Sequence, residues 1–281
     1  MDSFIRNKPL VINWMISGKC NLHCEFCYGQ FLSSQIKKED KFYILNQIAE
    51  HKVPKLILTG GEPMLDNDII EIIKMAYSHG IFTSLHTNGL LVNELFIQKI
   101  KKYIGRISLP LDGSSDYMNF LMRGEDKYFT KIIKLIEILK EKQISFSIKT
   151  VASKINLNDI EKIAEIMLFL NPHIWLITEF KPLRRGKSYQ DKFQLNPGDF
   201  DILKSKIKSY PLNVGFFSND NLSHHPHFFI NANGEVFTNG IETDFKIGSI
   251  FKESIPVLWS KIMEINKVNK LYFESAITLK K

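Results

Sequence analysis

Apolar and polar positions follow two different periods along the first 180 residues. Short apolar runs, such as residues 10–15 and 55–58, are typical of strands, whereas residues 68–78 place isoleucines at helical spacing. About six strand-like runs alternate with helical segments, which predicts a parallel sheet with right-handed crossovers. Such a sheet is too small to close as an eight-stranded barrel, so we expect an α/β fold that forms a partial, open (β/α)6 barrel.

The pattern changes after residue 180. Residues 181–191 are polar and basic, and the turn signal Asn233-Gly234 lies between two short apolar runs, which predicts a β-hairpin. Residues 199–210 and 255–266 have helical patterns. We therefore predict a core over residues 1–180 and a small C-terminal α+β extension over residues 181–281 that covers the substrate cavity.

Several polar segments directly follow predicted strands. They are the loop that contains the cysteines, Gly60-Gly61-Glu62-Pro63, Thr87-Asn88 and Asp112-Gly113. Because the carboxyl ends of parallel strands meet at one edge of a sheet, these segments are expected to converge on one rim. The sequence therefore predicts the functional site at that rim.

Composition is that of an ordinary globular chain with a basic surface. Of the 281 residues, 44% are hydrophobic and 24% are charged, and we find neither a signal peptide nor a run of about 18 apolar residues. We expect a cytoplasmic protein with no membrane partner and no nucleic-acid partner. The net charge of +7 comes mostly from lysines on helical segments, which indicates either a solvated surface or attraction to a phosphorylated or otherwise acidic substrate.

The three cysteines of the chain, Cys20, Cys24 and Cys27, all lie within eight residues. A disulfide framework would need an even number spread along the chain, so this pattern indicates a metal or a cluster. Thiolates suit zinc or iron–sulfur clusters, and three of them leave one iron of a cubane open to another ligand. A structural zinc site needs a fourth ligand, for which His23 is the candidate. Simultaneous chelation by His23 and the adjacent Cys24 would be strained.

The C-x3-C-x2-C spacing, with the aromatic Phe26 before the last cysteine, resembles the signature of radical S-adenosylmethionine (radical SAM) enzymes. The resemblance implies that the cysteines hold a [4Fe–4S] cluster and that SAM binds its open iron through amino and carboxylate groups. Reduction by an electron donor such as flavodoxin or ferredoxin would then release a 5′-deoxyadenosyl radical, which abstracts hydrogen from a substrate. The resemblance also implies that Phe26 and Tyr28 lie beside SAM.

Two of the segments after strands are similar to further elements of this family. Gly60-Gly61-Glu62-Pro63 resembles the element that binds the SAM amino group, and Thr87-Asn88 resembles the element near the ribose. Glycines allow a backbone to approach a ligand closely, and Glu62 can accept hydrogen bonds from an amine. Each segment alone is compatible with a simple turn, but the position of the first, one β–α unit after the cysteine loop, favours the cofactor role.

Three later residues extend the resemblance. Arg123 matches a residue that contacts the SAM carboxylate, and Val151 lies in a segment similar to the strand that contacts adenine. Ser108 lies two residues before the position of a serine that contacts the same carboxylate, on the same strand face. Pro110 stands where the family often has serine, which leaves the role of Ser108 open. The alternatives are an arginine on a surface helix for Arg123 and a core position for Val151.

The sequence resembles two branches of the family, which act on different classes of substrate. The C-terminal hairpin resembles that of SPASM/twitch-type peptide-modifying enzymes, but no cysteine follows Cys27 to bind an auxiliary cluster. Asn13-Trp14 and Asn171-Pro172 resemble viperin-like nucleotide dehydratases, in which basic residues hold the triphosphate. The candidates for that role are Lys149, Lys181, Arg184, Arg185 and Lys187. For Arg184, Arg185 and Lys187 the alternative is an ordinary solvated loop.

We therefore predict a radical SAM enzyme that acts on a nucleotide or another phosphate-bearing small molecule. One alternative is a maturase that modifies a short ribosomal peptide and has a degenerate auxiliary-cluster domain. Another is a non-catalytic iron–sulfur or zinc-binding regulator. His224, His225 and His227 form a further cluster, whose pattern fits a surface loop, a metal site or a wall of the substrate cavity.

Overall fold

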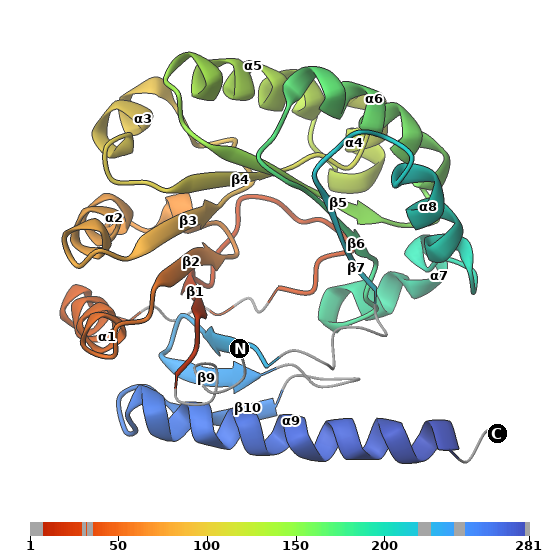
Figure 1. The fold of residues 1–281 in the computed structure, drawn as a ribbon. Coiled ribbons are helices and arrows are strands. Elements are labelled where there is room, and N and C mark those ends of the chain that lie inside the picture. Colours follow the sequence, from red (N-terminus) through yellow and green to blue (C-terminus); the bar gives the residue numbers. More distant parts are fainter. Residues whose placement is uncertain (1–7, 30–31, 33–35, 219–225, 239–244, 279–281) are drawn as a thin grey trace.

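The computed structural model describes residues 8–29, 32, 36–218, 226–238 and 245–278. Its strands form one sheet in the order β10-β9-β8-β1-β2-β3-β4-β5-β6-β7, which curves into an open C with most helices on its outer side (Figure 1). Neighbouring strands from β1 to β7 pair in parallel, and β8 joins β1 in parallel. This confirms the prediction of an α/β partial barrel with a mostly parallel sheet.

Strands and helices alternate up to β7. The strands are β1 (Val11–Ser17), β2 (Lys55–Gly60), β3 (Phe82–His86), β4 (Arg106–Pro110), β5 (Phe146–Ala152), β6 (Trp175–Glu179), β7 (Val214–Phe217), β8 (Phe228–Ile230), β9 (Glu235–Thr238) and β10 (Phe245–Ser249). The α-helices are α1 (Lys38–Glu50), α2 (Ile69–Ser78), α3 (Glu94–Ile100), α4 (Asp116–Arg123), α5 (Tyr128–Glu141), α6 (Ile160–Leu170), α7 (Gln190–Phe193), α8 (Asp199–Ile207) and α9 (Ile255–Thr278). Short 3-10 helices are η1 (Pro63–Leu65), η2 (Leu157–Asp159) and η3 (Arg184–Tyr189).

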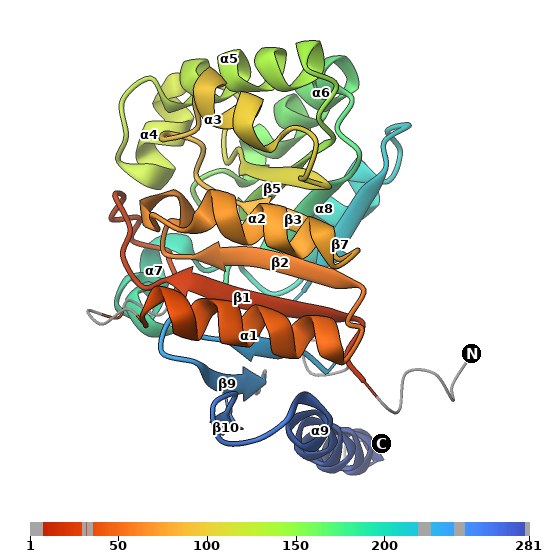
Figure 2. The same cartoon turned by 90° about the vertical axis from the view of Figure 1, so that its left-hand side faces the viewer.

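Alternation along the strands separates an outer face from an inner face. In β1 and β2 the residues on the outer face, Ile12, Trp14, Leu56 and Leu58, are fully buried, and the residues between them are only half-buried. Helices α1 and α2 lie outside β1–β3 (Figures 1 and 2). Each large apolar side chain buried in this layer contributes about 1.5–3 kcal/mol, so the outer face supplies the stability and leaves the inner face for other groups.

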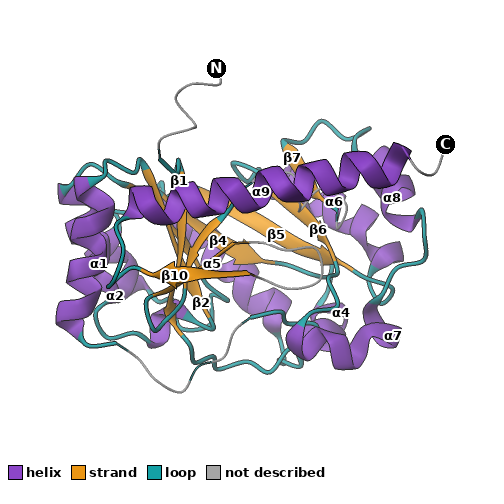
Figure 3. Cartoon of the chain, turned by 90° about the horizontal axis from the view of Figure 1, so that it is seen from below, coloured by secondary structure: helices purple, strands orange, loops and turns teal. Residues whose placement is uncertain are grey.

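The region after residue 180 extends the sheet at both edges. The hairpin predicted from Asn233-Gly234 is confirmed as β8–β9, which attaches to β1 and carries β10 at its outer side. Strand β7 pairs with β6 and was not predicted, because its sequence Val-Gly-Phe-Phe is too short to show a period. Helix α9 runs across the side of β10 (Figures 1 and 3). Within the described residues, no helix combines the length and apolar character needed to cross a membrane.

Candidate functional site

The cysteine loop begins directly after β1 and is held against the segment that follows β2. Gly61 N donates to the Ser17 carbonyl at 2.8 Å, and Glu62 N donates to the Lys19 carbonyl at 2.7 Å. Within the loop, Cys24 is buried and Cys20 and Cys27 are half-exposed. The carboxyl end of β2 therefore fixes where the cysteine loop starts, as the convergence of these segments on one rim predicts.

Gly60 and Gly61 are required by the close approach of the chain to itself. A Cβ added at Gly60 would lie 2.3 Å from the Ser17 carbonyl oxygen, and one at Gly61 would lie 2.2 Å from that of Lys19. The sequence argument assigned this close approach to a ligand. The structure shows that the group these glycines admit is the backbone at the start of the cysteine loop.

The carboxylate of Glu62 joins the segments that follow β2 and β3. Its Oε1 accepts from Thr87 Oγ1 at 2.6 Å and from Met64 N at 3.0 Å, and its Oε2 accepts from Asn88 N at 2.7 Å. Burial raises the pKa of Glu62, and these hydrogen bonds oppose that rise. Since a carboxylate accepts about four hydrogen bonds, the geometry leaves capacity for one further donor.

Thr87-Asn88 is tied to the cysteine loop as well. Asn88 Nδ2 donates to Asn21 Oδ1 at 2.7 Å, and the Tyr128 hydroxyl donates to the Asn88 carbonyl at 2.6 Å. The segment is thus a junction of three elements, and a simple turn does not describe it. Sequence reasoning missed Asn21, which occupies one of the unspecified positions between Cys20 and Cys24, and Tyr128, which stands in no recognisable motif.

Arg123 is the last residue of α4, and Gly124 ends the helix in the left-handed conformation. The Arg123 side chain is only 10% exposed, with Nη2 2.5 Å from Asp112 Oδ2 and Nη1 3.9 Å from Cys24 Sγ. Burial lowers the pKa of Arg123, but Asp112, Tyr128 and Cys24 together raise it more, so the net shift is upward. The alternative of an exposed helix arginine is therefore wrong.

Aromatic rings and backbone groups surround this ion pair. The rings of Phe26 and Tyr128 lie 5.4 and 5.3 Å from the Arg123 guanidinium carbon. On the other side, Val151 N donates to Asp112 Oδ1 at 2.8 Å. Phe26, which is part of the cysteine loop, and Val151 thus contact the two members of the ion pair, while Tyr28 is 54% exposed.

The sulfur atoms have the surroundings that a cluster held by three thiolates needs. Leu22 N lies 3.4 Å from Cys20 Sγ, Gly29 N lies 3.3 Å from Cys27 Sγ, and a guanidinium approaches Cys24 Sγ. Such N–H groups stabilise negative charge on cluster sulfurs. Burial raises the pKa of the Cys24 thiol to about 11, with Arg123 opposing the rise, and a bound metal would favour the thiolate that ligation needs.

Two buried polar atoms near the rim fit a further polar ligand. Within the part of the chain that the structure describes, Ser108 Oγ and Arg123 Nε have no hydrogen-bond partner. Buried polar atoms are normally paired, so the unpaired N–H of Arg123 beside Cys24 and the unpaired hydroxyl of Ser108 on β4 suit a ligand with acceptor atoms. Both residues are candidates from the sequence for contact with the SAM carboxylate.

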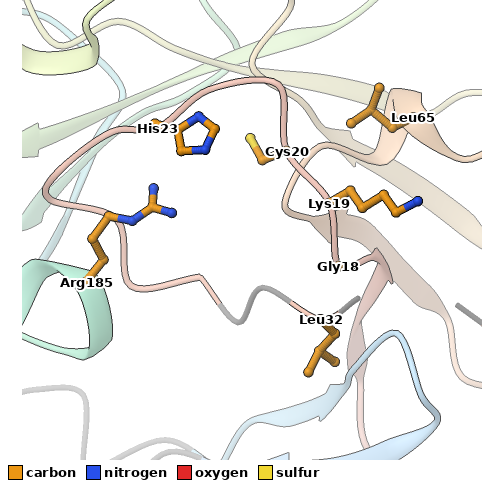
Figure 4. Close-up of a pocket in the computed structure, with 7 residues that line it drawn as sticks. All are labelled: Gly18, Lys19, Cys20, His23, Leu32, Leu65 and Arg185. Carbon is orange, nitrogen blue, oxygen red and sulfur yellow. The ribbon is translucent and has the colours of Figure 1, made fainter. Parts of the chain in front are cut away.

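A cavity of about 480 Å³ opens beside the cysteine loop, which is in the range of small-molecule sites. Figure 4 shows the side chains of Cys20, His23 and Arg185 at this cavity. The residues that line it are Gly18, Lys19, Cys20, His23, Leu32, Leu65 and Arg185. His23 is therefore part of the cavity wall, a position that its sequence neighbours do not reveal.

The predicted substrate residues fall in two places. Arg184 Nη1 donates to the Tyr28 carbonyl at 2.5 Å and Arg185 Nη1 to the Cys24 carbonyl at 3.4 Å, so this part of η3 packs on the cysteine loop. Lys181 lies half-buried just before η3, and Lys187 is exposed on it. Lys149 lies elsewhere, on β5.

Lys149 faces the inside of the barrel. It is half-buried between the fully buried Ile148 and Thr150, and its Nζ lies 3.0 Å from Nδ1 of His86, the last residue of β3. Burial, and next Lys55, lower the pKa of Lys149 to about 8. Burial also lowers the pKa of His86 well below its usual value, with further lowering by Lys149, Lys55 and Arg106.

The inner wall therefore carries a group of basic residues that the sequence did not single out. Lys55 begins β2 and Arg106 begins β4, and both contact the ring of Phe82, at 5.7 and 5.8 Å from its centroid. Among the described residues, no carboxylate pairs with Lys55, Arg106 or Lys149. Single basic residues at the ends of strands give no motif, so only the register of the sheet could reveal them.

The histidine cluster is only partly described. His224 and His225 lie outside the described residues, and the ring of His227 stacks on Phe229 with centroids 5.6 Å apart. No three His, Cys, Asp or Glu side chains of the described ranges are placed to hold one metal ion together, and this includes the three cysteines. In a cubane, each cysteine binds a different iron.

Comparisons with known proteins agree on one family. A family model described as the radical SAM superfamily matches residues 14–167. An AdoMet-dependent heme synthase of Methanosarcina barkeri is 28% identical over 69% of this chain and 56% of its own length. An S-adenosylmethionine-dependent nucleotide dehydratase of Flammeovirga pacifica is 29% identical over 62% of this chain and 63% of its own length. The chain thus spans little more than half the length of these relatives.

Two of the solved structures with a similar fold have a peptide bound. Streptococcus suis SuiB bound to the precursor peptide SuiA superimposes with a TM-score of 0.76, at 19% identity over 90% of this chain and 65% of SuiB. The enzyme anSMEcpe with bound AdoMet and a peptide gives a TM-score of 0.74, at 18% identity over 92% of this chain and 83% of its own. At this identity the likeness shows the fold.

The family match covers the part of the chain that forms the site. It covers more than half of the 281 residues and includes the cysteine loop, the Glu62 junction and Arg123. The chain therefore belongs to the radical SAM superfamily, and it is an enzyme whose cofactors are a [4Fe–4S] cluster and S-adenosylmethionine.

Proposed function

We propose that this radical SAM enzyme acts on an anionic small molecule, a nucleotide or another phosphate-bearing compound, held inside the barrel. The observation that carries the proposal is the positive inner wall. Lys55, Arg106 and Lys149 come from three different strands, and no carboxylate of the described residues pairs with them. A buried ammonium without a counter-ion costs free energy, which a bound phosphate would offset.

The register of the sheet puts Lys149 close to the rim, whereas Lys55 and Arg106 begin their strands at the opposite edge of the sheet. His86 pairs with Ser108 across β3 and β4, and Pro110 pairs with Lys149 across β4 and β5. His86 directly precedes Thr87, whose hydroxyl donates to Glu62. An anion bound at Lys149 would therefore place the rest of a small substrate near the residues proposed to hold SAM.

The proposal includes the residues that would hold the cofactors, which come from the resemblance to the family. Cys20, Cys24 and Cys27 are the proposed cluster ligands, and the bound cofactors supply the radical that removes hydrogen from the substrate. The residues proposed to contact SAM, or to shape its site, are Phe26, Tyr28, Gly60, Gly61, Glu62, Pro63, Thr87, Asn88, Ser108, Arg123 and Val151. Of these, Glu62 keeps one acceptor position, and Ser108 and Arg123 keep one donor each.

Residues 181–281 are proposed to cover the cavity. In this region Arg184 and Arg185 donate to carbonyls of the cysteine loop, and Gly186 N donates to the Cys27 carbonyl at 3.3 Å. A segment fixed in this way would exclude water from reactive intermediates. Reduction would come from a one-electron protein donor such as flavodoxin or ferredoxin.

The relatives support a small-molecule substrate without identifying it. One is named a nucleotide dehydratase and another a heme synthase, and the match to each is partial. A peptide substrate is the second candidate, because the structural neighbours SuiB and anSMEcpe bind peptides. The lack of any cysteine after Cys27 separates this chain from enzymes whose auxiliary clusters are bound there by cysteines.

The test is anaerobic reconstitution with iron and sulfide, followed by dithionite and SAM. Release of 5′-deoxyadenosine is then measured with nucleosides, their mono-, di- and triphosphates, a carboxylated tetrapyrrole and short peptides. We expect stimulation by phosphorylated compounds and none by the matching nucleosides. Stimulation by peptides alone would overturn the proposal in favour of a maturase, and stimulation by the tetrapyrrole alone would restrict the anion to carboxylates.

A further inference from the structure

The ion pair between Asp112 and Arg123 lies directly against one of the proposed cluster ligands. Arg123 Nη1 is 3.9 Å from Cys24 Sγ, and the same sulfur is 3.8 Å from the Arg123 carbonyl oxygen. The rings of Phe26 and Tyr128 contact the guanidinium. These contacts fix the arginine beside this sulfur before any cofactor is considered.

The pair has a fixed direction relative to Cys24. Arg123 is the member that reaches the sulfur, while Asp112 is completely buried and bound by Val151 N through its other oxygen. The positive end of the pair therefore points at Cys24. Because both side chains are buried, their charges act on their surroundings more strongly than surface charges would.

We propose that Arg123 makes the cluster bound at Cys24 easier to reduce, and that Asp112 limits this effect. Reduction adds one electron, and thus one negative charge, to the cluster. A positive charge beside a ligand sulfur stabilises the reduced form, and net charge and hydrogen bonds to the sulfurs are known determinants of cluster potential. Arg123 would therefore act on the cluster through its positive charge, in addition to any contact that it makes with SAM.

This role can be separated from binding of the SAM carboxylate. A residue that only binds SAM does not change the midpoint potential of the cluster when SAM is absent. The inference is also independent of the proposed substrate, because no substrate takes part in the measurement. Failure of one proposal therefore leaves the other untouched.

The experiment is a redox titration of the anaerobically reconstituted full chain without SAM, followed by the electron paramagnetic resonance signal of the reduced cluster. We expect Arg123→Gln to shift the midpoint to lower potential and Asp112→Asn to shift it to higher potential. Arg123→Lys keeps the charge and should shift it less than Arg123→Gln. Lys131→Gln removes a charge from an exposed ion pair on α5 and serves as the matched control, with no shift expected.

Opposite shifts in the two main variants support the inference, because general loosening of the packing would move both in the same direction. An unchanged midpoint in Arg123→Gln, combined with weaker SAM binding, would show that Arg123 is a carboxylate contact only and overturns the inference. If Arg123→Gln does not retain a full complement of iron, Asp112→Asn and Arg123→Lys decide the matter. An unchanged or lowered midpoint in Asp112→Asn then overturns it.

Discussion

The rim of the barrel and its inner wall differ in how their polar side chains are paired. At the rim, Glu62 accepts three hydrogen bonds and Arg123 is paired with Asp112. On the inner wall, Lys55 and Lys149 face the inside of the barrel, and none of the described carboxylates pairs with either. The side chains of the rim are held in place by hydrogen bonds and an ion pair within the protein. The positive charge of the inner wall has no carboxylate partner among the described residues.

This difference separates two kinds of binding. A site gains affinity for a cofactor of defined shape when its side chains are already fixed, because they lose little conformational entropy on binding. A wall of uncompensated positive charge lowers the stability of the empty protein and is relieved when an anion binds. The rim is therefore the part that the whole superfamily can share, and the wall is the part that can distinguish this chain by its substrate.

The largest effect is expected from Cys24→Ala. The substitution removes a proposed ligand and also the sulfur that contacts Arg123. We expect loss of the iron and of the visible absorbance of the cluster, and a fall in 5′-deoxyadenosine release on the order of 100-fold or more. Metal analysis and the cleavage assay check this, and circular dichroism shows whether the fold is kept. Full iron content in a folded variant would remove the cysteine loop from the cluster site.

Gly61→Ala tests whether the close contact between Gly61 and the start of the cysteine loop positions the cysteines. The new Cβ would lie 2.2 Å from the Lys19 carbonyl oxygen and 3.1 Å from Cys20 Cβ, so the start of the cysteine loop must move. We expect a loss of about 1–3 kcal/mol in the free energy of unfolding, together with reduced iron content.

Gly80→Ala is the matched control for this prediction. Gly80 has a positive φ of 72° but no atom within 4 Å of an added Cβ, so its substitution costs stability through backbone strain alone. We expect Gly80→Ala to keep its iron. Equal iron content in the two variants would mean that the contact between Gly61 and the loop does not position the cysteines.

On the inner wall, Lys149→Met is expected to weaken binding of anions by about 10- to 100-fold, the range for losing a charged hydrogen-bond partner. The measurement is isothermal titration of the reconstituted protein with inorganic tripolyphosphate and with nucleoside triphosphates. Iron content should stay unchanged, because Lys149 lies on β5, away from the cysteine loop. Removal of an uncompensated charge should also raise the melting temperature of the ligand-free protein.

Lys187→Met is the matched control, since Lys187 is exposed on η3 and was predicted from sequence for the same role. Unchanged binding in Lys187→Met with weaker binding in Lys149→Met places the anion inside the barrel. The reverse result would place it at the loop after β6 and would make the inner wall a structural feature only.

The same contrast explains what the sequence could predict. The rim was predictable because its residues are neighbours in the chain: the cysteine spacing, Gly60-Gly61-Glu62-Pro63 and Thr87-Asn88 each occupy one short segment after a strand. The partial barrel was predictable from the alternation of periods. The contact of the glycines with the start of the cysteine loop was not predictable, because this backbone is about forty residues away and its path follows only from the pairing of β1 with β2.

The inner wall was not predictable in the same way. Lys55, His86, Arg106 and Lys149 come from four strands, and their proximity depends on the register between those strands. Only Lys149 was selected beforehand, from its place on a late strand. Arg123 shows the same limit, because its burial depends on Asp112, eleven positions earlier, and on two rings from other segments.

The smallest effect expected is a dependence of anion binding on pH. Burial, and next Lys55, lower the pKa of Lys149 to about 8, and the charged or titratable groups near it are His86 on β3, Lys55 on β2 and Arg106 on β4. The ammonium form holds the anion, so the part of the affinity for tripolyphosphate that depends on Lys149 should be fully present well below pH 8 and be lost as the pH rises through 8, by at most about tenfold per unit. His86 stays neutral across this range because its pKa is far lower.

Lys149→Met should bind weakly with little change between pH 7 and 9. If the wild-type protein showed the same flat profile, the ammonium of Lys149 would not be the group that recognises the anion, and the contrast between rim and wall would lose its functional meaning.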